Sequence, residues 1–498
     1  MVNIPPPSLQ PANNSVARQT AVGSTYTIAA SAMTLVIGFT RSVILARLLF
    51  PEDFGLFALA FFFVRLLERV QMFGFTAAFI HKQDQTQAEV AAHFILRLGS
   101  AIVVIGLALA IAPLLRHFYP EEQLLAQVVI VITVVRLIMA FNDTPKTILT
   151  KQLQFRRLAV LRVSGSLLAL FLTGWLAWSG AGVWSLVAQD FCFFIVELAG
   201  LWFIRRPWKL SLKTRWDIIK WYFQFGKYHF VSKNIAVLLD TFDDFWVGTF
   251  LGSVSLGFYA KAYEFAQYPR AVVAEPINSV FFPAFARLQH DRRRLSRAFF
   301  RSASLLVRVG FLVAGAFVFV TPEFVRLFLG EKWLPMQLTF QLMLIYTLLD
   351  PLLTLSSQLV LANGQTKTLA KIQTWQMIFF MPLVIIASRF FSIEGVAVAA
   401  DLMLALGFIF IVPQLRHFVD FSLRQMVFIP ILALIAALLS SMWIISLLPE
   451  MHTAVTLAQK GLIISVIYTI ILLIFEREQL QKSGEMVKQL LCKQSGSK

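Results

Sequence analysis

Charged residues are scarce in this chain of 498 residues. They make up 14% of the sequence, whereas hydrophobic residues make up 58%. Soluble domains average about 25% charged and about 45–50% apolar residues. The mean hydropathy is +0.72, and the apolar excess is spread along the whole chain. This composition excludes a soluble protein with a single anchor and predicts an all-α, polytopic membrane protein.

Cysteine is also scarce. Cys192 lies in an apolar run and Cys492 lies near the C-terminus, so the pair offers no disulfide framework. The seven histidines are scattered, and we find no P-loop, no H-E-x-x-H motif and no G-x-S-x-G motif in a strand-to-helix context. We therefore expect no metal site, no cofactor and no catalytic residue. The pattern favours moving a molecule over reacting it.

The apolar runs predict about fourteen spanning helices, because roughly 20 apolar residues cross the hydrocarbon core of a bilayer. None of the connections between them is long enough to fold as a separate domain. The expected ranges are 21–40, 54–80, 91–115, 123–142, 158–178, 182–204, 224–250, 256–284, 300–320, 336–361, 368–388, 394–412, 426–447 and 457–475.

The formal net charge of +17 raises the question of a nucleic-acid partner. If the N-terminus is cytoplasmic, 25 loop and tail lysines and arginines fall on the cytoplasmic side and six on the other. This bias is the positive-inside signal of a multi-pass protein of the plasma membrane with both termini cytoplasmic. No nucleic-acid-binding motif accompanies the charge, so we expect no nucleic-acid partner.

A short repeat predicts the domain organisation. FGLFALA begins at Phe54 and LGFYAKA at Leu256, so the matching glycines, Gly55 and Gly257, are 202 residues apart. Six predicted helices separate the motifs, which gives both copies the same orientation. We expect a cytoplasmic tail (1–20), an N-lobe of six helices (21–204), a basic amphipathic linker (205–223), a C-lobe of six helices (224–412), two further helices (413–475) and a cytoplasmic tail (476–498).

The predicted helix 54–80 carries charges at its centre. Arg65, Glu68 and Arg69 are spaced i, i+3 and i+4, so they share one face, and Glu68 can pair with both arginines. A charge at membrane depth costs about 2.5–3.5 kcal/mol on the insertion scale. We therefore interpret this face as the border of a polar cavity. The alternative is an architectural ion pair that fixes helix packing.

The second half of the chain has acidic residues in predicted helices. Asp240, Asp243 and Asp244 repeat at i, i+3 and i+4. Mutual repulsion should raise the pKa of at least one of them or attract a cation, so a proton or sodium site is one hypothesis, with Glu264 as a further candidate. Pairing with the arginines of the other lobe is the alternative. Single charges at Arg136, Asp190, Glu197, Arg308, Asp350 and Asp401 fit packed or interface positions at least as well.

Four segments together resemble a known family. They are ILARLLFPEDFGLFALA from Ile44, GFYAKAYEFA from Gly257, FFPAFARLQHD from Phe281 and FLGEKW from Phe328. In this order the chain resembles the Wzx-type flippases of lipid-linked oligosaccharides, in the multidrug/oligosaccharidyl-lipid/polysaccharide exporter superfamily. The branch it looks most like is that of the colanic-acid and exopolysaccharide exporters.

The resemblance implies a flippase of the bacterial inner membrane. It would move undecaprenyl-diphosphate-linked repeat units to the periplasmic leaflet for exopolysaccharide, capsule or lipopolysaccharide O-antigen, by alternating access between the lobes. Its partners would be this lipid-linked oligosaccharide, the bilayer and other assembly proteins. Arginines suit phosphate, so we expect Arg65, Arg69 and Arg270 to hold the diphosphate and Glu68 to place the arginines. The alternatives are a cation-coupled antiporter of the same superfamily and a polysaccharide polymerase or ligase.

Overall fold

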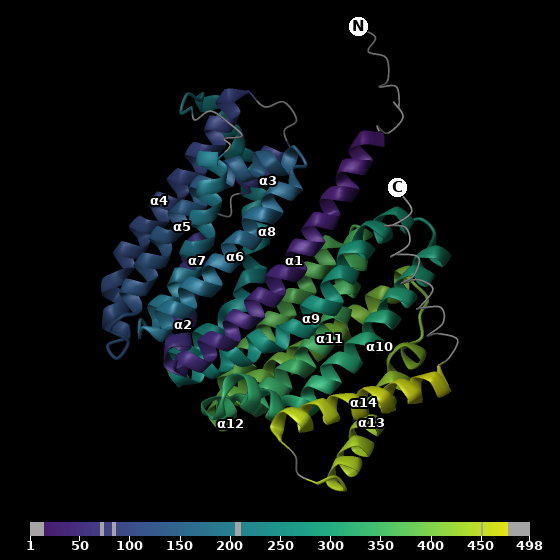
Figure 1. Ribbon diagram of the computed structural model, residues 1–498. Helices are drawn as coiled ribbons and strands as arrows, with labels where there is room; N and C mark the ends of the chain where they lie inside the picture. Colours follow the sequence, from purple (N-terminus) through teal and green to yellow (C-terminus); the bar gives the residue numbers. More distant parts are fainter. Residues whose placement is uncertain (1–13, 70–73, 82–85, 205–210, 450–451, 477–498) are drawn as a thin grey trace. The chain divides into compact units, whose positions relative to one another are not determined.

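The computed structural model describes residues 14–69, 74–81, 86–204, 211–449 and 452–476, and every regular element in these ranges is a helix (Figure 1). Most of the predicted tails and part of the linker lie outside the described residues. The α-helices are α1 (Asn14–Leu48), α2 (Pro51–Glu68), α3 (Phe75–His81), α4 (Gln87–Phe118), α5 (Leu125–Lys151), α6 (Phe155–Trp178), α7 (Val183–Leu198), α8 (Trp216–Trp246), α9 (Ser253–Leu288), α10 (Arg292–Phe324), α11 (Gln337–Ala362), α12 (Thr366–Phe418), α13 (Ile429–Ser446) and α14 (Thr453–Phe475).

Short π-helical or 3-10 segments extend several of these helices. They are η2 (Ala199–Ile204), η3 (Val247–Leu251), η4 (Val325–Leu329), η5 (Glu331–Met336) and η6 (Arg424–Phe428). Glycines with a positive φ end two of them: Gly252 at +89° follows η3, and Gly330 at +99° follows η4. Glycine fits this left-handed region without steric cost, so the chain can turn sharply there and start the next helix.

The all-α membrane architecture predicted from composition is confirmed. Within the described ranges, ten helices are long and apolar enough to cross a membrane. One of them, α12, is two helices joined at a kink, where Phe391 and Ser392 leave the helical conformation. The kink lies between the predicted spans 368–388 and 394–412. The three long helices outside this set are α2, α8 and α9.

One predicted span is wrong. Residues 54–80 were expected to form one helix, but α2 ends at Glu68 and a separate short helix, α3, begins at Phe75. Gly74 adopts a φ of +66°, which an α-helix cannot contain. Residues 70–73 between them lie outside the described residues. The apolar composition of 54–80 did not reveal this break, because a glycine inside an apolar run is common in membrane helices.

The chain divides into two units. Unit 1 comprises residues 1–49, 60–234 and 490–498, and unit 2 comprises residues 50–59 and 235–489. Two helices are therefore shared: the first half of α2 belongs to unit 2 and its second half to unit 1, whereas α8 starts in unit 1 and ends in unit 2. The lobe boundaries expected from the repeat stay a prediction.

Each unit has its own apolar core. In unit 1, α4 packs along α5 and α6 along α7 (Figure 1), and Phe94 of α4 is buried in one cluster with Leu201 of η2. In unit 2, α10 is central: Phe299 and Phe311 lie in a cluster that also takes residues from α11, α12, α13 and α14. The helices α13 and α14 therefore pack on the second unit.

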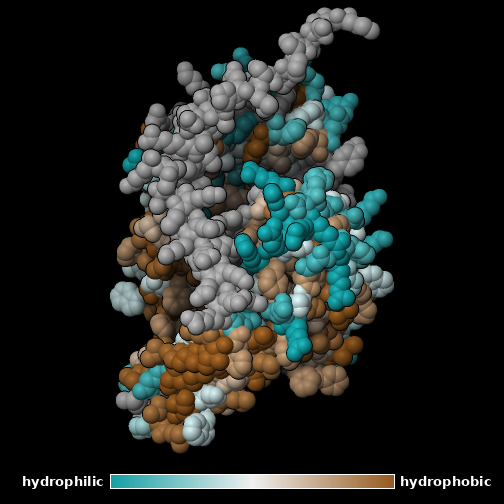
Figure 2. Space-filling view, turned by 90° about the vertical axis from the view of Figure 1, so that its right-hand side faces the viewer, coloured by the Kyte–Doolittle hydropathy of each residue, from teal (hydrophilic) through white to brown (hydrophobic). Residues whose placement is uncertain are grey.

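Apolar side chains also cover part of the outer surface. Figure 2 shows one face on which hydrophobic residues form a broad area beside a group of hydrophilic ones. Trp443 on α13 and Leu462 on α14 are each 67% exposed. In water such a surface would be unfavourable, but it matches the hydrocarbon interior of a bilayer.

Candidate functional site

A group of charged side chains lies inside unit 1, where α2, α5 and α7 come together. Arg136 of α5 donates two hydrogen bonds of 2.7 Å to the carboxylate of Glu68 at the end of α2. Its second terminal nitrogen lies 3.5 Å from a carboxylate oxygen of Asp190 on α7. One guanidinium thus joins two carboxylates from different helices, which is the arrangement that keeps ionised groups stable away from water.

Arg65 and Arg69 stand beside this group on α2. The guanidinium of Arg65 lies 4.8 Å from the centre of the Phe61 ring, and that of Arg136 lies 4.9 Å from the same centre. Arg65 is exposed and Arg69 is partly buried. We expected Glu68 to pair with these two arginines, but its ion pair is with Arg136. The nearby carboxylate is thus already satisfied and does not neutralise Arg65.

Arginines outnumber carboxylates in this cluster. Its three arginines, Arg65, Arg69 and Arg136, carry three positive charges, and Glu68 and Asp190 carry two negative charges when ionised. Arg41 of α1 also acts electrostatically on Asp190 and adds to this surplus of basic groups. Such a surplus favours an anion, because arginine forks hydrogen-bond phosphate oxygens in a bidentate manner.

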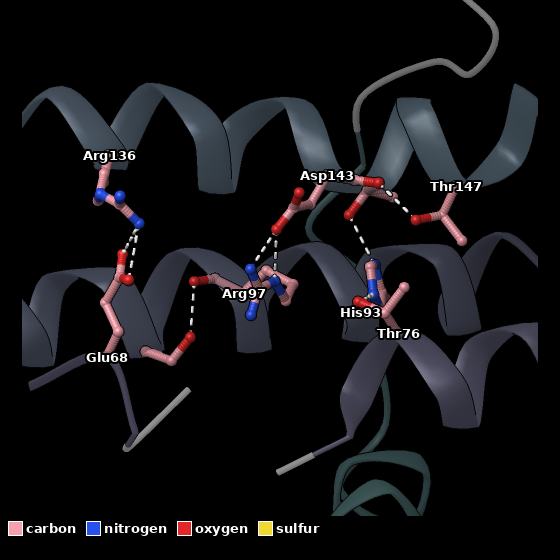
Figure 3. A network of polar contacts seen from close by, with 9 residues as sticks. Glu68, Thr76, His93, Arg97, Arg136, Asp143 and Thr147 are labelled. Atoms are coloured by element: carbon pink, nitrogen blue, oxygen red, sulfur yellow. Dashed lines mark hydrogen bonds and ion pairs between the residues drawn. The ribbon is translucent and has the colours of Figure 1, made fainter. Parts of the chain in front are cut away.

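A row of polar pairs continues from this cluster along α4 and α5 (Figure 3). Arg97 of α4 donates from its Nε to Asp143 of α5 at 2.7 Å, and its terminal nitrogen contacts the same oxygen. Further along, the ring of His93 lies 2.8 Å from the Thr144 hydroxyl and 3.4 Å from that of Thr76 on α3. These polar groups satisfy one another, so the row can lie between helices without unpaired charge.

Sequence reasoning did not single out Arg97 or Asp143. Asp143 lay just past the end of the predicted span 123–142, although α5 continues to Lys151. One signal was available: Arg136 and Asp143 are seven residues apart, and so lie on the same face of a helix. Lys146, on the same helix, pairs with Glu197 of α7. The charges at 136, 190 and 197 are therefore members of ion pairs.

The candidate acidic site of unit 2 is partly described. Asp243 on α8 accepts a hydrogen bond of 2.7 Å from the hydroxyl of the buried Tyr259 on α9. Asp244 is partly buried, and the side chain of Asp240 lies outside the described part of the chain. Glu264 accepts a hydrogen bond of 2.7 Å from Lys261. The described residues include no group of three or more metal-ligating side chains that could hold an ion.

Arg270, the third expected diphosphate ligand, belongs to unit 2. Its guanidinium lies 2.8 Å from a carboxylate oxygen of Asp350 on α11. The pair joins α9 to α11, and both side chains are only partly buried. Arg65 and Arg69 belong to unit 1, so the contacts of these two arginines and those of Arg270 are described separately, each within its own unit.

Three of the sequence motifs meet within unit 2. A Cβ atom on Gly55 of α2 would lie 1.7 Å from the carbonyl oxygen of Ser253, and one on Gly257 of α9 would lie 1.9 Å from that of Pro51. These contacts are reciprocal: each glycine of the repeat faces the residue four positions before the other glycine. The two helices touch backbone to backbone, as small residues allow in membrane proteins.

The FLGEKW segment packs against this contact between α2 and α9. Trp333 of η5 is fully buried, and its ring lies 5.4 Å from that of Phe54 and 5.8 Å from that of Phe258, edge to face in both cases. The Lys261 side chain is 4% exposed and its ammonium lies 4.1 Å above the Phe54 ring. We call this set of residues on α2, α9 and η5 the glycine crossing.

Comparisons with known proteins agree on the kind of protein. A family model described as "Polysaccharide biosynthesis protein" matches residues 44–338. The succinoglycan biosynthesis transport protein ExoT of Rhizobium meliloti is 30% identical over 303 residues, which is 59% of each chain. The lipopolysaccharide biosynthesis protein WzxC of Escherichia coli is 21% identical over 387 residues, 77% of this chain and 78% of that one. The chain thus spans about three fifths of the length of ExoT.

Two solved structures share the fold. The lipid II flippase MurJ in an inward closed conformation covers 92% of this chain and 99% of its own, with a TM-score of 0.71 and 15% identity. An inward-facing multidrug resistance MATE family transporter of the MOP superfamily covers 78% of this chain and 95% of its own, with a TM-score of 0.60 and 15% identity. At this identity the likeness concerns the fold.

Proposed function

Because this chain belongs to the polysaccharide biosynthesis protein family, whose model covers residues 44–338, we propose that it is a flippase for lipid-linked oligosaccharides. It moves undecaprenyl-diphosphate-linked repeat units from the cytoplasmic to the periplasmic leaflet of the bacterial inner membrane, as a transporter and without a catalytic site. The relatives named as transport and lipopolysaccharide biosynthesis proteins and the fold of a lipid II flippase support this assignment.

The observation that carries the proposal is the positive surplus of the cluster on α2, α5 and α7. A diphosphate with a sugar chain cannot cross hydrocarbon unaided, because its charge and hydrogen bonds would go unmet. In our proposal Arg65 and Arg69 bind the diphosphate, and Arg270 is a further diphosphate ligand. The ion pair of Glu68 with Arg136 supports a revised role for Glu68: it fixes Arg136 and leaves Arg65 available.

The polar row along α4 and α5 provides the start of the path. With the N-terminus cytoplasmic, α5 runs toward the cytoplasm, so the row from Arg136 to Thr144 extends from the middle of the membrane toward that side. Its ion-paired side chains are only partly buried and can exchange their mutual hydrogen bonds for bonds to sugar hydroxyls. The polyprenyl tail needs no such partners and stays in the lipid.

The glycine crossing supports the movement. Since α2 and α8 each belong to both units, a change between the units can be taken up within these two helices. The first turns of α2 are held against α9 by backbone contact at Gly55 and Gly257. We propose that the first turns of α2 stay in contact with α9 while α2 bends beyond Leu59, where the helix passes into unit 1.

Resetting the empty carrier involves the acidic residues of unit 2. A diphosphate moving outward runs with an inside-negative potential, which contributes about 2.3 kcal/mol per charge per 100 mV. The return step then needs a counter-ion, and we propose Asp240, Asp243, Asp244 and Glu264 as its site. Transport in vesicles that is indifferent to both pH and sodium would remove this role.

Deletion of the gene followed by lipid analysis tests the function as a whole. We expect the loss of exported polysaccharide together with lipid-linked repeat units that accumulate on the cytoplasmic leaflet. Repeat units that reach the periplasmic leaflet normally but are not joined into polymer would instead indicate a polymerase. Unchanged export would contradict any role in this process.

A further inference from the structure

Unit 2 contains an apolar cavity that the proposed transport path does not use. Its volume is about 600 Å³, within the roughly 300–1,000 Å³ of ligand pockets. It is lined by α10, α11, α12, η6, α13 and the turn between α12 and η6. None of the helices that carry the proposed substrate residues, α2, α8 and α9, contributes to it. The cavity is therefore a feature of unit 2 in its own right.

The lining combines an apolar floor with one charge at the rim. Phe299, Leu352, Leu415 and Met426 are buried and form part of the floor. Only two of the fourteen lining residues are polar. Ser356 donates its hydroxyl hydrogen to the carbonyl oxygen of Leu352 in its own helix, so it offers no donor to a ligand. The other polar residue is Arg424, which is exposed.

The rim is held in a fixed shape by contacts from α10. Arg292 binds both carboxylate oxygens of Asp420, at 2.7 and 3.3 Å, and also reaches the carbonyl oxygens of Arg416 and His417. The backbone N–H of Asp420 donates to the Ser296 hydroxyl at 2.9 Å. The turn beside the cavity is thus fastened at several points, which pre-organises the rim for a ligand.

Charge at the rim identifies the kind of ligand. Asp420 is the acidic group of this turn, and it is already neutralised by Arg292. Arg416 and Arg424 have no carboxylate partner among the described residues. A ligand that fits must therefore have a long apolar part and an anionic head. Basic pockets between helices on the cytoplasmic side of a membrane suit lipids of this type.

We propose that this cavity binds an anionic phospholipid of the surrounding bilayer, with one acyl chain against the floor and the phosphate at Arg424. The lipid is a bound component of unit 2 that remains in place while substrate passes. A zwitterionic lipid has the same acyl chains, but a positive charge in its headgroup balances the phosphate, and so it binds more weakly. The polyprenyl chain of the substrate is assigned elsewhere, because none of the lining residues of the cavity is a proposed diphosphate ligand.

Native mass spectrometry of the full-length protein tests the proposal, with phosphatidylglycerol and phosphatidylcholine added separately in detergent. Arg424→Gln removes the rim charge at an exposed position, and Val412→Phe fills the cavity. Arg389→Gln, an exposed arginine on α12 outside the lining, is the matched control. Size-exclusion profiles of all variants confirm folding, and the exposed Arg424→Gln keeps the test valid if Val412→Phe does not fold.

We expect the wild type and Arg389→Gln to retain phosphatidylglycerol in preference to phosphatidylcholine. Arg424→Gln should weaken the retention of phosphatidylglycerol about fivefold, which corresponds to about 1 kcal/mol for one arginine at a membrane surface. Val412→Phe should weaken retention of both lipids. Equal retention of the two lipids by the wild type, or unchanged retention by Arg424→Gln, would overturn the proposal. Displacement of the lipid by undecaprenyl phosphate would assign the cavity to the substrate tail and overturn it too.

Discussion

The glycine crossing gives the sharpest test of the packing, through Gly55→Ala and Gly257→Ala. The new Cβ atoms would lie 1.7 and 1.9 Å from backbone carbonyl oxygens, whereas real Cβ atoms essentially never come closer than 3.0 Å. The helices must therefore separate by about 1.3 Å for Gly55→Ala and by about 1.1 Å for Gly257→Ala, which is the distance that each new Cβ atom lacks from the 3.0 Å limit. Backbone atoms cannot swing aside as the end of a side chain can.

Separation on this scale costs energy in several contacts at once. Adding a methyl group to a packed site costs about 1–3 kcal/mol, and the edge-to-face contacts of Trp333 with Phe54 and Phe258 would loosen as well. Both substitutions act on one crossing, so the double variant should lose less than the sum of the single losses. We expect lower midpoints of thermal unfolding, by roughly 2–4 °C per kcal/mol.

Gly310→Ala on α10 is the matched control, because it lies in the same unit and a Cβ there would meet nothing within 4 Å. Its midpoint should stay the same or rise slightly, since alanine favours the helix. The assay is thermal unfolding of purified protein in detergent, followed by export in cells that lack the chromosomal copy. Equal midpoints for all three single variants would refute the close contact of the two repeat motifs.

Three further outcomes follow from other polar side chains. Arg308 and Glu476 are each 2% exposed and lie 2.8 Å apart, so Arg308→Met alone should cost about 3–5 kcal/mol, whereas replacing both residues with methionine should cost much less in thermal unfolding. The hydrogen bond from Arg292 lowers the pKa of Asp420. The ion pair between Arg292 and Asp420 should therefore be intact above pH ~4 and be lost only as the pH falls below that value. Lipid retention measured from pH 3 to 8 would show this loss. If Asp243 takes part in coupling, Asp243→Asn should remove the pH or sodium dependence of transport in vesicles while the protein stays folded.

The helical architecture followed from composition because a bilayer permits few alternatives. A chain with this many apolar runs must satisfy its backbone polar groups within helices. The kink of α12 at Phe391 and Ser392 fell between two predicted spans because both halves read as separate apolar runs. The break after Glu68 was missed, because it depends on the backbone conformation of Gly74 and not on apolarity.

The charged residues were easier to find than to pair. Arg65, Glu68 and Arg69 were singled out by their spacing on one helix, but the partner of Glu68 comes from α5, 68 residues away. Such a contact is set by which helices pack together, and spacing within one helix does not contain that information. Arg270 with Asp350, and Arg308 with Glu476, were hidden for the same reason. A single sequence indicates where charges lie in the membrane, and the fold determines their partners.

The most direct measurement of the central claim is flipping by purified protein in vesicles that contain an undecaprenyl-diphosphate-linked oligosaccharide. Each charged hydrogen bond lost from a phosphate costs about 1.5–3 kcal/mol. The variant with both Arg65→Ala and Arg69→Ala should therefore flip at least about a hundredfold more slowly, whereas Arg389→Ala should match the wild type. If the double variant is folded and flips at the wild-type rate, these arginines do not bind the diphosphate and the account is contradicted.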